Sequence, residues 1–283
     1  MSNLSDDERK VQNRVIDFFT NTLNYTYIGN LRDFENSNIM TDRLHSYLSK
    51  KGYSEKLIKG AVAELDKTSK NLQHGIYDAN KNVYNLLKYG AKVKEDIDKP
   101  EKTIYFIDFD NPAENDFAVA EEVTIIQNNE KRPDLVVYIN GIALAVIELK
   151  KSSISVSDGI RQNLTNQMAN FIEQFFSTIQ FCVAANELEG LRYGTLKTPE
   201  KYYLEWKQDG YKEFQDERDK TDLLIEEQCS HLDERLYIDL LNLFYKKRFL
   251  DLISNFIVFD KGRKKVCRYN QYYAIKRAQK RLT

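Results

Sequence analysis

The chain has 283 residues, of which 42% are hydrophobic, so it can bury one large core or two smaller ones. Its 42 lysines and arginines balance 43 aspartates and glutamates, which does not exclude a nucleic-acid-binding protein, because a local basic patch suffices. The three cysteines and three histidines are scattered without CxxC spacing, which argues against structural zinc and favours the reducing cytoplasm. No apolar run reaches 18 residues, so the sequence predicts no signal peptide, membrane span or membrane partner.

The first ninety residues predict helices, because their apolar residues recur at helical spacing. Ser54 is expected to cap the third helix, whereas Gly52 and Gly90 are expected to end the second and the fourth. The predicted helices cover residues 5–24, 36–54, 54–69 and 79–90.

Strand-like segments follow, crossed by one helix, and then further helices. Strands are predicted at 102–110, 116–126, 132–151 as a hairpin, 179–186 and 191–206 as a strand pair; helices are predicted at 159–178 and about 221–255. This order of elements, with helices first, then a sheet crossed by one helix, and then further helices, predicts an α/β domain.

The hairpin "RPDLVVYINGIALAVIELKK" carries charge at one end of two apolar strands. Glu148 and Lys150 are two residues apart, so both face the same side of the sheet. The side on which Asp134 lies depends on the turn. A two-residue turn at 140–141 pairs Asp134 with Ile147 and separates it from Glu148, whereas a three-residue loop pairs Asp134 with Val146 and gathers all three charges.

The charge pattern favours the three-residue loop with Gly141 at positive φ, because it produces a joint site. Two nearby carboxylates repel each other unless a cation intervenes, and Mg²⁺ prefers hard oxygen ligands. Asp134, Glu148 and the carbonyl of Leu149 can supply such ligands, while Lys150 can hold the attacking water or offset phosphate charge. The competing interpretation is a structural cluster of ion pairs.

Asp134 after Pro133, followed by Glu148-Leu149-Lys150, resembles the PD-(D/E)xK nuclease signature. The surrounding sequence resembles the R (restriction and motor) subunits of type I restriction enzymes, and this resemblance covers most of the chain. The quoted segments are "FENSNI", "RPDLVVYINGIALAVIELKKS", "GIRQNLTNQ", "GLRYGTLKTPEKYYLEW" and "NFIVFDKGRKKVCRYNQYYAIKRAQ". The resemblance implies a restriction-endonuclease-like core, a mixed sheet flanked by helices, with extra N- and C-terminal helices. It also implies that Asp134 and Glu148 bind Mg²⁺ and that Lys150 completes the catalytic centre.

The family often adds a Gln followed four residues later by a Tyr. Gln162 lies at the matching distance, but Asn166 stands where the Tyr is expected, and Gln167 with Phe171 repeats the spacing later. Gln162 is the favoured candidate for positioning DNA or water. Nucleases of this fold often add an acid from an early helix, for which Glu35 is the candidate, in competition with a surface role.

The resemblance divides the chain into an endonuclease domain at 1–256 and a basic segment at 257–283 that opens a motor domain. Gln271 matches the glutamine that reads adenine in that motor. No GxxxxGK[ST] phosphate loop is present, so ATP is expected as a cofactor only of the longer protein. The resemblance further implies double-stranded DNA as substrate and methylation (M) and specificity (S) subunits as partners. Two rivals are a stand-alone repair nuclease and a catalytically silent docking module of the same fold.

Overall fold

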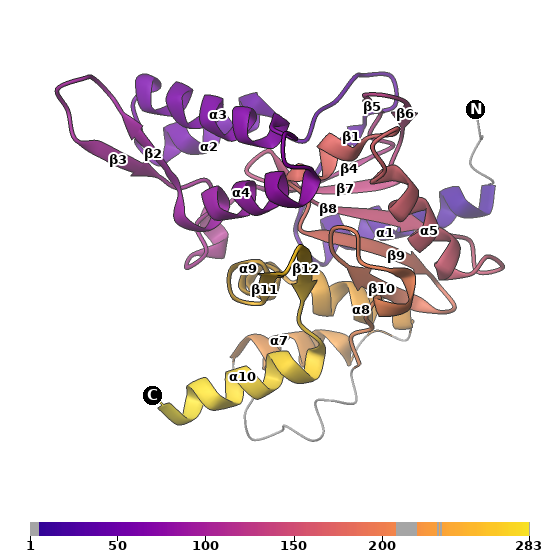
Figure 1. Ribbon diagram of the computed structural model, residues 1–283. Helices are drawn as coiled ribbons and strands as arrows, with labels where there is room; N and C mark the ends of the chain where they lie inside the picture. Colours follow the sequence, from indigo (N-terminus) through magenta and orange to yellow (C-terminus); the bar gives the residue numbers. More distant parts are fainter. Residues whose placement is uncertain (1–5, 208–219, 231, 233, 283) are drawn as a thin grey trace.

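The computed structural model describes residues 6–207, 220–230, 232 and 234–282, and it has the predicted α/β architecture (Figure 1). A six-stranded mixed sheet lies at its centre, in the order β1-β4-β7-β8-β9-β10. Its strands are β1 Thr26–Asn30, β4 Phe117–Glu121, β7 Leu135–Ile139, β8 Ile142–Leu149, β9 Phe181–Asn186 and β10 Gly190–Gly194. The pairs β1–β4 and β8–β9 are parallel, and the other neighbouring pairs are antiparallel.

Both faces of the central strands are covered, because every residue of β7 and β8 is buried. Leu135, Val137 and Ile147 face the larger core, to which the N-terminal helices and the helices after β10 contribute. Val136 and Val146 face a second cluster with the short helix η2 Glu173–Ser177. The two carboxylates of the hairpin, Asp134 and Glu148, lie at the end of this second face.

Four helices precede most of the sheet, as predicted: α1 Asp6–Asn21, α2 Thr41–Lys50, α3 Glu55–Lys70 and α4 Ile76–Tyr89. Gly52 and Gly90 follow α2 and α4 at φ +79° and +78°, which confirms them as helix ends. Ser54 is the N-cap residue of α3, as predicted, but its side chain makes no capping hydrogen bond, and its hydroxyl donates to Glu95 Oε1 at 2.6 Å.

Two small hairpins accompany the sheet. The first, β2 Ala91–Lys94 with β3 Glu101–Ile104, projects from the body beside α3 (Figure 1), and the second pairs β5 Ile125–Ile126 with β6 Glu130–Lys131. The predicted helix at 159–178 is shorter, because α5 Val156–Asn166 ends before η2. The predicted strand pair at 191–206 is largely wrong: β10 pairs with β9, and the chain then forms the turn η3 Glu200–Tyr202, with one bridge between Tyr193 and Leu204.

The C-terminal part packs onto the same body. It consists of α7 Lys220–Cys229, α8 Arg235–Phe244, α9 Lys246–Asn255, the hairpin β11 Ile257–Asp260 and β12 Arg263–Val266, and α10 Tyr269–Leu282. Ile257, Tyr272 and Tyr273 belong to the main core, so residues beyond 256 have no core of their own. In the described part of the chain, no helix combines the length and apolarity needed to cross a membrane.

Candidate active site at the end of the central hairpin

The turn of the central hairpin is tight, and the favoured three-residue loop is wrong. Ile139 pairs with Ile142 across Asn140 and Gly141, whose φ values are +52° and +80°. Positive φ at both positions is the signature of a type I′ turn, which matches the twist of the flanking strands. The expectation of positive φ at Gly141 is therefore confirmed.

A bulge beyond the turn nevertheless brings the carboxylates to one face. The register shifts between Tyr138 and Val137, after which Val137 pairs with Ala145 and Leu135 with Ile147. Leu144 and Ala145 both contact the larger core, as expected for an extra residue in a bulge. Continuing the shifted register by one residue sets Asp134 opposite Glu148.

The carboxylates of Asp134 and Glu148 lie next to each other. Glu148 is fully buried, and its Oε2 atom has no hydrogen-bond partner. Asp134 is partly exposed, and its Oδ2 accepts the backbone N–H of Leu149 at 2.7 Å. Burial raises the pKa of Glu148 well above its usual range, and the Asp134 charge raises it further. Burial raises the pKa of Asp134 to about 6, against the opposing charge of Lys150.

Helix α5 supplies two side chains to the site around this pair, one to Lys150 and one to Glu148. The hydroxyl of Ser155 caps the helix by accepting the N–H of Ser157 at 3.2 Å. Gln162 accepts a hydrogen bond from Lys150 Nζ at 2.7 Å, and Asn166 donates one to Glu148 Oε1 at 3.3 Å. Lys150 is thus held by a neutral amide rather than by a carboxylate, which disfavours the interpretation of a structural ion-pair cluster.

Other predicted residues lie elsewhere. Gln167 is turned away from the carboxylates, because its amide binds the backbone of Asn163 and Lys197. Glu35 lies on an exposed loop and is not brought into a metal-sized group with the hairpin. Gln271 is exposed at the start of α10, where its Oε1 accepts the N–H of Arg268 at 2.9 Å.

Three further residues at the site escaped sequence reasoning. Glu122, at φ +51°, raises the pKa of both carboxylates by its charge, and Glu8 of α1 adds to the effect on Asp134. Gln12, also of α1, donates to Glu122 Oε1 and to the carbonyl of Asp134, both at 3.4 Å. Glu8 affects Asp134 only through its charge, and within the described residues neither Glu8 nor Glu35 joins a metal-sized group of ligands. The pair of acids in "AVAEEV" was the available signal for Glu122.

The donor set suits a hard divalent cation. The unpartnered Oε2 of Glu148 and the adjacent Asp134 carboxylate form a negative site that a cation would neutralise. Within the described ranges, no group of three or more His, Cys, Asp or Glu could hold a metal. Two carboxylates match Mg²⁺, which usually keeps several waters. The carbonyl of Leu149, at the end of β8, remains a predicted third ligand.

Comparison with known proteins gives one consistent result. Residues 5–201 match the family described as "Type I restriction enzyme R protein N terminus". The chain is similar to the MjaIXP type I restriction enzyme endonuclease subunit of Methanocaldococcus jannaschii, with 29% identity over 77% of this chain and 21% of that protein. It is also similar to the MjaVIIIP subunit of the same organism, with 30% identity over 64% of this chain and 16% of the relative. The HindI endonuclease subunit of Haemophilus influenzae matches at 24% identity over 70% and 19% of the two chains.

Proposed function

The chain belongs to the family of type I restriction enzyme R protein N termini, and from this membership we propose that it is a Mg²⁺-dependent nuclease domain that hydrolyses phosphodiester bonds of double-stranded DNA. The observation that carries the proposal is the Asp134–Glu148 pair with its unpartnered oxygen, next to a lysine held by Gln162. Metal-activated hydrolysis of a phosphodiester requires such a combination of hard ligands and a nearby cation.

Each side chain has a separate task in the proposed reaction. Asp134 and Glu148, with the Leu149 carbonyl, hold the metal, which when bound supplies the Lewis acidity that activates water. The Lys150 ammonium offsets phosphate charge or orients the attacking water, and Gln162 fixes its position. Asn166 donates to Glu148 Oε1, which leaves Oε2 directed to the ligand position.

The chain spans about a fifth of the length of the relatives it matches. We propose that the whole protein also translocates DNA with ATP, and that Gln271 then contacts adenine. We further propose that it works with methylation and specificity subunits, which leaves target recognition outside this chain. These proposals rest on the resemblance. Since the chain has no phosphate loop, we expect no DNA-stimulated ATP hydrolysis from it.

Two neighbouring lysines provide a matched test of the nuclease proposal. In the full-length enzyme, Lys150→Ala should abolish DNA cutting, because Lys150 lies at the proposed catalytic centre, where Gln162 holds it. ATP-driven translocation should continue, because the proposed motor binds ATP elsewhere on the longer chain. Lys151→Ala removes the same charge one residue later and should cut normally. Plasmid linearisation and translocation are measured in parallel. Wild-type cutting by Lys150→Ala would refute its catalytic role, and a wild-type chain that binds no Mg²⁺ by calorimetry would favour a silent docking module.

A further inference from the structure

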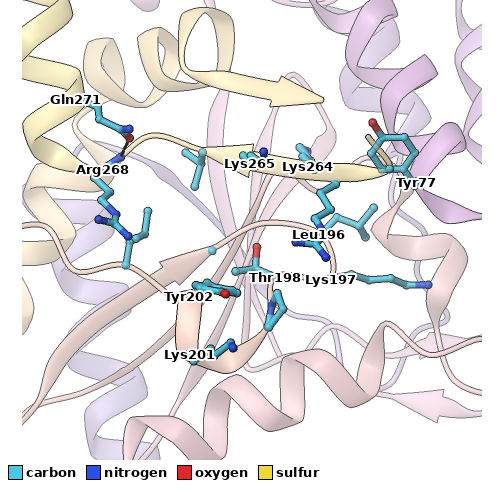
Figure 2. Close-up of a pocket in the computed structure, with 16 residues that line it drawn as sticks. Tyr77, Leu196, Lys197, Thr198, Lys201, Tyr202, Lys264, Lys265, Arg268 and Gln271 are labelled. Atoms are coloured by element: carbon cyan, nitrogen blue, oxygen red, sulfur yellow. Dashed lines mark hydrogen bonds between the residues drawn. The ribbon is translucent and has the colours of Figure 1, made fainter. Parts of the chain in front are cut away.

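Lys264 is buried although open space lies beside it. It belongs to β12 and lines a pocket of about 620 Å³ between that strand and residues 194–204 (Figure 2). A lysine in such a place usually buries its methylene chain and keeps its charged end in water. Lys264 is instead 4% exposed, whereas its neighbours Arg263 and Lys265 are exposed. Because burying a charge costs free energy, an apolar side chain would suit this position better if packing were its only role.

The ammonium of Lys264 contacts three neutral oxygens. Its Nζ donates to Gln180 Oε1 at 2.6 Å, to Asn80 Oδ1 at 2.8 Å and to the carbonyl of Ile179 at 3.2 Å. Three acceptors match the three N–H donors of an ammonium group. Burial lowers the pKa of Lys264, and no carboxylate among the residues that the structure describes forms an ion pair with it. Lys264 therefore joins Gln180 to α4, the helix that carries Asn80.

Gln180 extends this connection to the central hairpin. It is fully buried and directly precedes β9. Its backbone N–H donates to the carbonyl of Leu144 at 2.7 Å, and its own carbonyl accepts the hydroxyl of Thr195 at 2.8 Å. Leu144 is the extra residue of the bulge in β8, and this bulge sets Asp134 opposite Glu148. The hydrogen bond from Gln180 therefore holds the bulge from the side of β9.

We propose that Lys264 is a positioning residue of the carboxylate pair: acting through Gln180, it holds the bulge at Leu144 and so keeps Asp134 opposite Glu148. Without the ammonium, three oxygens are left buried and unpaired, which is unfavourable until they move apart. Gln180 then withdraws its N–H from Leu144. The bulge can then move along β8, which turns the two carboxylates toward opposite sides of the sheet. The inference rests on the proposed function only for its effect on Mg²⁺, because the hydrogen bonds that carry it need no metal.

Amide hydrogen exchange tests the positioning in the 283-residue chain, in buffer with EDTA. The reporter is the N–H of Leu149, which donates to Asp134 Oδ2 at 2.7 Å. The N–H of Leu65, a buried residue of α3, reports the stability of the whole fold. The ratio of the two exchange rates separates a change at the carboxylate pair from a general loss of stability.

Three variants are compared with the wild type. Lys264→Met removes the ammonium and keeps an unbranched apolar chain. The charge control, Lys265→Met, removes the adjacent exposed charge. The hydroxyl control, Tyr25→Phe, removes a buried hydroxyl that donates to the carbonyl of Phe244 at 2.8 Å, beside the edge strand β1.

In Lys264→Met, Leu149 should exchange on the order of tenfold faster relative to Leu65, whereas both controls should keep the wild-type ratio. Gln180→Met leaves Lys264 two of its three acceptors and should show the same change. Adding Lys264→Met to Gln180→Met should then produce no further change, because the two residues act in series. If Lys264→Met does not fold, Gln180→Met alone carries the test.

Calorimetry measures the consequence for the metal. Mg²⁺ should bind Lys264→Met on the order of tenfold more weakly than the wild type, as when an outer partner of metal ligands is removed. If the wild type binds no Mg²⁺, the proposed nuclease function fails, and the exchange ratio still decides whether Lys264 positions the pair. A wild-type exchange ratio in Lys264→Met or, if that variant does not fold, in Gln180→Met would overturn the proposal. An equal change in the hydroxyl control, or an unchanged Mg²⁺ affinity where the wild type binds the ion, would do the same.

Discussion

Glu148 is an acid that the fold buries beside another acid without enough positive charge to neutralise both. Its pKa is raised first by burial and then by Asp134, and Lys150 offsets only part of this effect. The folded state therefore favours the protonated form, and deprotonation at neutral pH costs free energy of unfolding. A bound divalent cation reverses that cost. We therefore expect the two acids of the site to lower the stability of the folded protein until a divalent cation binds.

Replacing Glu148 by Gln should stabilise the metal-free protein, and the gain should grow between pH 5 and pH 8. A carboxyl with a raised pKa binds its proton more tightly when folded, so the wild type loses stability as pH rises from the unfolded value toward the folded one. Each unit of raised pKa corresponds to about 1.4 kcal/mol, and each kcal/mol to about 2–4 °C in Tm. The measurement is a set of thermal melts across this pH range.

Magnesium supplies the second arm of that experiment. It should raise the Tm of the wild type and leave Glu148→Gln nearly unchanged, because the variant lacks an anionic ligand. Glu227→Gln, an exposed change on α7, is the control and should follow the wild type throughout. If Glu148→Gln instead melts well below the metal-free wild type at pH 8, Glu148 acts as a structural ion-pair partner.

At the residue scale, the sequence best predicts which residues come together when they lie close to one another in the chain. Asp134, Glu148, Lys150 and Gln162 meet because they lie on one hairpin and the helix that follows it. Glu8 could not be found in this way, because α1 reaches the site only through tertiary packing. Glu35 lies on an exposed loop, in agreement with the competing surface role, and its carboxylate does not join the pair.

At the scale of elements, one register considered from the sequence had a regular two-residue turn with no bulge, and the other placed a bulge at the turn. The turn is regular, and the extra residue enters β8 among buried apolar side chains. A leucine in a bulge has no distinctive sequence signature, since it contributes to the core as its neighbours do. Asn140-Gly141 did carry a signal, because both residues tolerate positive φ.

Gly141→Ala should destabilise the protein far more than Gly262→Ala. Both glycines have positive φ, at +80° and +76°, so both changes incur strain of about 1 kcal/mol. A Cβ at Gly141 would also lie 2.6 Å from the carbonyl oxygen of Met40, whereas a Cβ at Gly262 meets nothing within 4 Å. We expect a loss of about 3 kcal/mol or more at Gly141. Urea unfolding measures the difference, and equal losses would contradict this account of the turn.

At the scale of the whole molecule, residues 257–282 are part of the body described here. Lys264 of β12 reaches Asn80 on α4 and the residue before β9, while Tyr272 and Tyr273 are buried beside Trp206. The division at 256 remains a prediction about the longer protein. The basic composition and the periodicity of residues 257–283 do not reveal which distant surface a helix covers.

A chain that ends at residue 256 should therefore be much less stable than one that ends at 276. The shorter chain loses both buried tyrosines and Lys264, each apolar ring being worth about 1.5–3 kcal/mol. The longer one loses only the last residues of α10, which are exposed or partly exposed. Cooperativity of thermal unfolding and protection from protease report the result. Equal stability of the two chains would make residue 256 a true domain boundary.

The bulge at Leu144 has a consequence for how such sites diverge. Side chains on a strand alternate sides, so the spacing of Asp134 and Glu148 obeys a rule of parity. An insertion of two residues in the hairpin keeps both carboxylates together, whereas a single insertion turns one of them to the opposite side. A change in the length of the turn, or the gain or loss of a bulge, can restore the match. A search for relatives with a fixed interval between the two acids would therefore miss proteins whose acids still lie on one side of the sheet. It would also accept proteins whose acids lie on opposite sides.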